Sequence, residues 1–178
     1  MPPPTNTQGP SRWRVGVVGQ TGSGKSTACG FLADWGAVVV NADDLAHEVY
    51  LPGTPTCAAI LSHWGETVRR SDGAVNRREL AKIVFADDQQ RGLLEALVWP
   101  PLHDRILRTM SMVQAGVIVL DAAVLVRAGW LDLVDEVWTI ERDPDVSVRH
   151  AACRDGIDVT DVQQRLAAQE SQLSLIHI

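Results

Sequence analysis

The feature that most constrains the fold is a glycine-rich turn at residues 19–26, which reads G-Q-T-G-S-G-K-S. It fits the pattern G-x-x-x-x-G-K-[ST] at every fixed position, with a strand-like run at about 13–18 before it and a helical pattern from Lys25 to Trp35 after it. This arrangement is a P-loop, in which backbone N–H groups and the positive end of the helix face the phosphates of a nucleotide. We expect Lys25 to reach the β- and γ-phosphates and Ser26 to ligate Mg²⁺.

Three further segments predict the rest of a sheet, at residues 37–40, 116–121 and 136–140. Continuous apolar runs, such as the one at 37–40, are typical of parallel strands that are covered on both faces. Together with the strand before the P-loop, they predict an α/β fold of the P-loop NTPase class, similar to nucleoside and nucleotide kinases. The expected sheet is parallel, in the order 2-3-1-4, with helices on both faces.

The stretch from Leu51 to Gly116 has no strong strand pattern and predicts a helical insertion between the second and third strands. Four helices are expected there: one ending near Trp64, one from an Asn76 cap to Phe85, one capped by Asp87 and ending at Trp99-Pro100-Pro101, and one over 102–114. The prolines end the third of these because proline has no amide donor. The insertion is the natural place for a cap that binds the phosphate acceptor.

Two carboxylates follow predicted strands, where ligands of such sheets bind. Asp43 follows the second strand and is a candidate catalytic group near the reacting end of the nucleotide; the alternative is that Asp43 caps a helix over 45–50. Asp121 ends four apolar residues in the third strand, a pattern that resembles a Walker B strand, so we expect it to hold Mg²⁺ directly or through water.

The region after the fourth strand predicts short helices that carry arginines. Asp143 and Pro144 form a helix start, and the helix over 144–153 carries Arg149 and His150. Such helices resemble the lid of a kinase, and the alternative is a solvated charged face.

Composition excludes several classes of function. The formal charge of −6 and the lack of a basic block argue against nucleic acid as the main partner. No apolar run approaches the length of a membrane span, and the first residues have no signal-peptide core, so we expect a cytoplasmic protein. The three cysteines have no C-x-x-C spacing and are expected to be buried or half-buried reduced thiols.

Three classes of P-loop protein can be compared with the sequence. A switch GTPase needs Asp-x-x-Gly after the third strand and an Asn-Lys-x-Asp guanine reader, and neither is present. A nucleic-acid motor needs basic patches and a longer chain. A small-molecule kinase remains, in which a carboxylate at the end of the second strand orients the acceptor hydroxyl. Another nucleotide or metabolite kinase, or a nucleotide-binding protein without turnover, stays open.

The sequence resembles the dephospho-coenzyme A kinase family from Arg14 to about Gln169. The resemblance is carried by the P-loop, the Asn41-Ala42-Asp43 turn with Leu45-Ala46-His47, Pro52-Gly53-Thr54-Pro55, Asp72-Gly73-Ala74-Val75-Asn76-Arg77, and Arg154-Asp155-Gly156. Trp99-Pro100 and the Asp121–Leu125 stretch are similar to the kinase half of bifunctional CoA synthase.

The resemblance implies ATP-dependent phosphorylation of the 3′-hydroxyl of dephospho-CoA, the last step of coenzyme A biosynthesis, with the help of Mg²⁺. We expect the protein to be a monomer. The implied catalytic residues are Asp43, as base, and Lys25, and we expect Arg149, one residue from the family's lid position, to be the lid residue. The implied ATP-binding residues are Gly22, Ser23, Gly24, Lys25, Ser26, Thr27 and Arg154. Asp43, His47 and Asp121 are the implied substrate contacts, and Ser26 and Asp121 the implied metal ligands.

The chain departs from the family at several positions. Asn41 replaces an aspartate, Arg127 replaces a glutamate, and His150 falls where the family has a lid arginine. The family's last strand, adenine-contacting loop and final helix are expected to be missing after Gln169. The expected organisation is an extension at 1–11, a kinase domain at 12–172 (core 12–50 and 116–142, CoA-binding insertion 51–115, lid 143–172) and an unrelated tail at 173–178.

Overall fold

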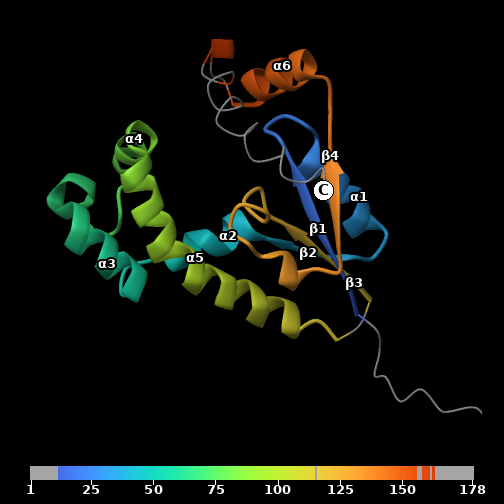
Figure 1. The fold of residues 1–178 in the computed structure, drawn as a ribbon, viewed down its shortest axis with the longest axis horizontal. Helices are drawn as coiled ribbons and strands as arrows, with labels where there is room; N and C mark the ends of the chain where they lie inside the picture. The colour runs from blue at the N-terminus through green and yellow to red at the C-terminus, as the bar shows by residue number, and fades with distance from the viewer. Residues whose placement is uncertain (1–11, 115, 156–157, 161, 163–178) are drawn as a thin grey trace, which may run out of the picture. The chain divides into compact units, whose positions relative to one another are not determined.

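The computed structural model describes residues 12–114, 116–155, 158–160 and 162 (Figure 1). Its internal contacts divide the chain into two units. The core unit consists of Met1–Val40 with Met110–Ile178, and the helical unit is Asn41–Thr109. Among the described residues, no helix is both long enough and apolar enough to span a bilayer.

A four-stranded sheet forms the centre of the core unit, in the order β2-β3-β1-β4. The strands are β1 (Arg12–Gly19), β2 (Val38–Asn41), β3 (Gly116–Asp121) and β4 (Glu136–Ile140). β1 pairs in parallel with β3, from Arg12↔Gly116 to Val17↔Asp121, and with β4, from Val15↔Glu136 to Gly19↔Ile140. The predicted strand order is therefore confirmed.

Helix α1 (Lys25–Asp34) packs on one face of this sheet (Figure 1). Cys29 of the helix is buried with Val15, Val17 and Val119, and Leu32 adds to the same cluster. On β1, Gly16 lies close to Leu125 and Val134 of the segment after β3, which includes a short 3₁₀ helix, η2 (Leu131–Leu133). Helix α6 (Pro144–Asp155) follows β4, and its start is capped by Asp143, whose Oδ1 accepts from the amides of Asp145 and Val146.

The helical unit contains α2 (Ala42–Val49), α3 (Pro55–Trp64), the 3₁₀ helix η1 (Gly65–Val68), α4 (Arg77–Ala86) and α5 (Asp88–Ser111), whose last residues extend into the core unit. Of these, α3, α4 and α5 lie in the segment where the insertion is predicted. The predicted caps form: Oδ1 of Asn76 accepts from the amide of Glu79, and Oδ1 of Asp87 accepts from the amides of Gln89 and Gln90. The carboxylate of Glu79 binds Lys82, so only one half of a capping box is made.

The prediction of two helices separated at Pro100-Pro101 is wrong, because α5 is one helix with both prolines inside it. Proline removes an amide donor from each position, which weakens a helix interior. Val98, Leu102, Ile106 and Met110 recur every four residues and are all buried, so α5 has a continuous apolar stripe on both sides of the prolines. Burial of this stripe offsets the missing hydrogen bonds.

Gly16 and Gly30 offer a matched test of the packing in the core unit. A β-carbon on Gly16 would lie 2.4 Å from Cδ2 of Leu125 and 3.3 Å from both methyl groups of Val134, so Gly16→Ala should lower the free energy of unfolding by about 1–3 kcal/mol. Gly30 is exposed on α1 with nothing within 4 Å of such a carbon, so Gly30→Ala should raise it by about 1 kcal/mol. Urea denaturation measures both, and effects of the same sign would contradict this packing.

Candidate active site

The turn between β1 and α1 has the backbone geometry of a phosphate-binding loop. Gly22 and Gly24 have φ angles of 82° and 98°, a region that favours glycine, and the amide of Ser23 donates to the carbonyl of Gln20 (3.1 Å). Gly24 is the N-cap of α1 and provides no side-chain cap. The first-turn amides of α1 can therefore donate to an anion.

The P-loop is held closely by the segments that follow β4. A β-carbon on Gly22 would lie 2.2 Å from the carbonyl oxygen of Ser147 in α6, so only glycine fits there. A β-carbon on Gly24 would lie 3.2 Å from Nη2 of Arg142, which places this guanidinium beside the start of α1. Arg142 was not predicted as a site residue, and the available signal was its place just after a strand end.

The structure brings together two of the predicted site residues, Lys25 and Asp121. The Lys25 ammonium forms an ion pair with the Asp121 carboxylate, and their side chains are 16% and 4% exposed. Asp121 is the last residue of β3 and pairs in register with Val17 of β1, just before the P-loop. The carboxylate is buried, and such a charge is stable only with a partner of opposite charge.

Cys29 lies one helical turn after Lys25 and next to this ion pair. Burial, and then the negative charge of Asp121, raise the pKa of the Cys29 thiol to about 11. Cys57 is also buried, as expected, whereas Cys153 is exposed, which corrects the prediction that all three thiols are at least half-buried. The reason is that Cys153 lies four residues after Arg149 on the exposed face of α6, whereas Val148 and Ala151 form its buried face.

Asp43 and His47 lie on the exposed face of α2, four residues apart, while Ala42, Leu45 and Val49 form its buried face. The N-cap of α2 is Asn41, not Asp43: Oδ1 of Asn41 accepts from the amides of Asp43 (2.8 Å) and Asp44 (3.2 Å). The alternative role of Asp43 as a cap is therefore wrong, because the helix begins two residues earlier than the position that this role requires. Both residues belong to the helical unit.

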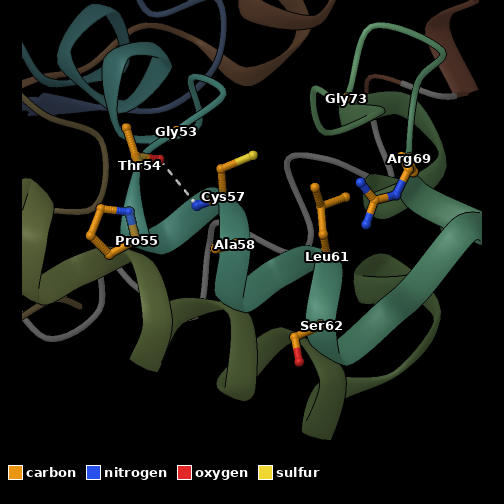
Figure 2. Close-up of a pocket in the computed structure, with 9 residues that line it drawn as sticks. All are labelled: Gly53, Thr54, Pro55, Cys57, Ala58, Leu61, Ser62, Arg69 and Gly73. Atoms are coloured by element: carbon orange, nitrogen blue, oxygen red, sulfur yellow. Dashed lines mark hydrogen bonds between the residues drawn. The ribbon is translucent and has the colours of Figure 1, made fainter.

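The helical unit also contains a cavity of about 500 Å³, shown in Figure 2. Residues of α3 and of the turn before it form much of its wall, and the side chain of Arg69 supplies a positive charge. Arg69 also pairs with Glu66 (2.8 Å). A second cavity of about 220 Å³ is lined in part by Arg105 and Arg108. The sequence predicted an acceptor-binding cap in this insertion but not the cavities themselves, although Gly53, Thr54, Pro55 and Gly73 in the wall of the larger one belong to segments that carry the family resemblance.

The remaining predicted residues are only partly described. Arg149 is exposed on α6, and Ser26 and Thr27 are exposed in the first turn of α1. Ser23 is buried, and its hydroxyl has no hydrogen-bond partner among the described residues. The side chains of His150 and Arg154 lie outside what the structure describes.

Alkylation of the cysteines tests the environment of the ion pair. Because the thiolate is the nucleophile, Cys29 should resist iodoacetamide near neutral pH in the folded protein, and exposed Cys153 should react. Peptide mapping by mass spectrometry measures the labelling, and both residues should react in denaturant. Equal labelling rates in the folded protein would contradict the buried placement of Cys29.

The chain is similar to dephospho-CoA kinases along most of its length. The sequence model of the dephospho-CoA kinase family matches residues 13–175. The dephospho-CoA kinase of Geobacter sulfurreducens is 42% identical over 158 residues, which cover 87% of this chain and 80% of the relative. That of Symbiobacterium thermophilum is 37% identical over 160 residues, which cover 88% of this chain and 67% of the relative.

Solved structures agree with the fold. A structure from Thermus thermophilus superposes with a TM-score of 0.80 at 26% identity, covering 94% of this chain and 85% of that one. The dephospho-CoA kinase of Campylobacter jejuni superposes with a TM-score of 0.59 at 20% identity, covering 92% of this chain and 85% of that one, and supports the fold alone. The fold and the family expected from the resemblance are both confirmed, and the chain belongs to the dephospho-CoA kinase family.

Proposed function

We propose that this chain transfers the γ-phosphoryl group of ATP to the 3′-hydroxyl of dephospho-CoA, giving coenzyme A and ADP. The observation that carries the proposal is the Lys25–Asp121 ion pair beside a P-loop, in a member of the dephospho-CoA kinase family. We also expect the protein to act as a monomer in the cytoplasm, where thiols such as those of Cys29 and Cys57 stay reduced.

The P-loop binds the phosphates of ATP in this proposal. The first-turn amides of α1 donate to the phosphate oxygens, and the flanking glycines let the backbone approach them closely. Lys25 leaves Asp121 to contact the β- and γ-phosphates and neutralises the charge that develops during transfer. Gly22, Ser23, Gly24, Ser26 and Thr27 complete the proposed ATP contacts, with Arg154 from the lid.

The residues near Lys25 fit a magnesium ion. Mg²⁺ in phosphate-transfer sites takes one or two carboxylates together with substrate oxygens, and it prefers hard oxygen ligands. Ser26 offers an exposed hydroxyl in the turn that contains Lys25, and Asp121 offers a carboxylate that Lys25 already reaches. We propose these two residues as its ligands, directly or through water. When bound, the ion would offset the negative charge of the phosphate groups.

Asp43 is the proposed general base. It follows the end of β2 by two residues, and ligands of open α/β sheets bind beyond the carboxyl ends of their strands. Its carboxylate would accept the proton of the 3′-hydroxyl as the hydroxyl oxygen attacks the γ-phosphorus and ADP leaves. His47, one turn later on the same exposed face of α2, would contact the acceptor.

The helical unit is the proposed binding region for dephospho-CoA. Its larger cavity, about 500 Å³, lies in the range of small-molecule sites and combines apolar walls with the positive charge of Arg69 (Figure 2). Such a lining suits a ligand with both a long apolar arm and anionic groups. Arg149 on α6 is the proposed lid residue, which would close over the phosphates and exclude water.

Phosphoryl transfer to dephospho-CoA, followed by mass spectrometry, tests the proposal. Lys25→Ala should lower kcat roughly 100-fold or more, because it removes charge stabilisation. Asp43→Asn should lower kcat by about 100-fold or more, because the base is lost. Asp44→Asn is the matched control, an exposed carboxylate in the same helical turn, and should retain activity. Phosphorylation of adenosine or AMP in preference to dephospho-CoA would contradict the proposed acceptor.

Substitution of Asn41 tests whether the cap of α2 positions Asp43. Asn41→Ala removes the acceptor of the Asp43 and Asp44 amides, and should lower the free energy of unfolding by about 1 kcal/mol and reduce kcat as the first turn loosens. Asn41→Asp keeps an acceptor there and should retain both stability and activity. Chemical denaturation and steady-state kinetics measure the pair. Full activity in Asn41→Ala would contradict a positioning role.

A further inference from the structure

Arg142 lies in a short, exposed connection between two fixed points of the core unit, β4 and α6. On one side, Ile140 ends β4 in register with Gly19, and a β-carbon on Gly19 would lie 2.6 Å from the Ile140 carbonyl oxygen. On the other side, Asp143 caps α6 through the amides of Asp145 (2.9 Å) and Val146 (3.2 Å). The backbone at Arg142 is therefore held against the P-loop.

The guanidinium of Arg142 lies at the start of α1. Its Nη2 is 3.2 Å and its Cζ 3.7 Å from the position of a β-carbon on Gly24, the residue that caps this helix without a side chain. The N-terminus of a helix carries partial positive charge, so a cation there is unfavourable by itself. An anion that bound both groups would remove this penalty.

Nothing in the described part of the chain neutralises Arg142. It makes no ion pair and no hydrogen bond with the described residues, although acidic Glu141 and Asp143 flank it in sequence. Oδ1 of Asp143 is occupied in capping α6. Lys25, in contrast, is already paired with Asp121. Arg142 is thus a cation beside the P-loop that is available to a ligand.

We propose that Arg142 binds the α- and β-phosphates of the nucleotide, as a second cation of the ATP site in addition to Lys25. The inference rests on the proposed function, because it assigns a phosphate ligand to the P-loop. The last glycine of a P-loop lies beside the α- and β-phosphates, and a guanidinium can donate two parallel hydrogen bonds to phosphate oxygens. Neither of these two groups is transferred, so Arg142 contributes mainly to nucleotide affinity, and it affects turnover only through the negative charge that grows on the β-phosphate as ADP leaves.

Calorimetric titration with ADP, in the absence of dephospho-CoA, tests this role. Arg142→Met keeps much of the apolar stem and removes the charge, and it should weaken ADP binding roughly tenfold and raise the KM for ATP similarly, with kcat little changed. Arg142→Lys should restore part of the affinity, because it keeps the charge without the planar fork. Glu141→Gln is the control for disturbance of the connection, and should bind ADP at least as well as the wild-type protein. Without nucleotide, the melting temperature of Arg142→Met should equal or slightly exceed that of the wild-type protein, because a cation at the start of a helix is removed, whereas a purely structural role of Arg142 would lower it.

The outcomes separate this inference from the proposed function. Unchanged ADP affinity in Arg142→Met, with activity on dephospho-CoA retained, would overturn the role of Arg142 and leave the proposed function standing. A fall in kcat at unchanged KM would also overturn it, because that result places Arg142 on the transferring phosphoryl group. Arg142-dependent ADP binding in a protein that does not phosphorylate dephospho-CoA would support the role of Arg142 and overturn the proposed acceptor.

Discussion

The ion pair between Lys25 and Asp121 is the interaction on which the rest of the site depends. Asp121 is 4% exposed, and a carboxylate that is buried to this degree needs a cation within reach. The cation comes from the P-loop because β1 and β3 are adjacent and parallel, with Val17 opposite Asp121. The strand order and the motif therefore support each other: another order would bury the carboxylate without its partner.

The shape of the P-loop is set by residues far along the chain as well as by its own glycines. Gly22 has a left-handed backbone and leaves no room for a side chain, because the backbone of Ser147 in α6 fills the adjacent space. β4 reaches the same region through the pairing of Gly19 with Ile140. A P-loop motif thus specifies a turn, while β4 and α6 determine which groups surround the phosphates.

Sequence reasoning predicted the sheet because each strand is short, has apolar residues and ends in a recognisable turn or carboxylate, as at Asp121. It failed where a local rule opposed tertiary burial. Proline predicts the end of a helix, yet α5 continues through Pro100 and Pro101 because its buried stripe runs on both sides. The alternative role of Asp43 as a helix cap was wrong because Asn41 and Asp43 are both good caps, and only the hydrogen bonds to the backbone amides distinguish them.

The difference between local sequence patterns and tertiary contacts also explains why the sequence predicted Lys25 and Asp121 but not Arg142. The first two belong to motifs, whereas the position of Arg142 depends on the approach of β4 to the P-loop. The negative formal charge of the chain makes a cation at the position of Arg142 important for binding phosphate. With a formal charge of −6, the protein as a whole does not attract polyanions such as ATP, and exposed charges beyond about 8 Å are largely screened at physiological salt. Affinity for phosphate must then come from groups at the site. The first-turn amides of α1 can donate to it, and since Lys25 is balanced by Asp121, Arg142 adds a positive charge that no other described residue pairs with.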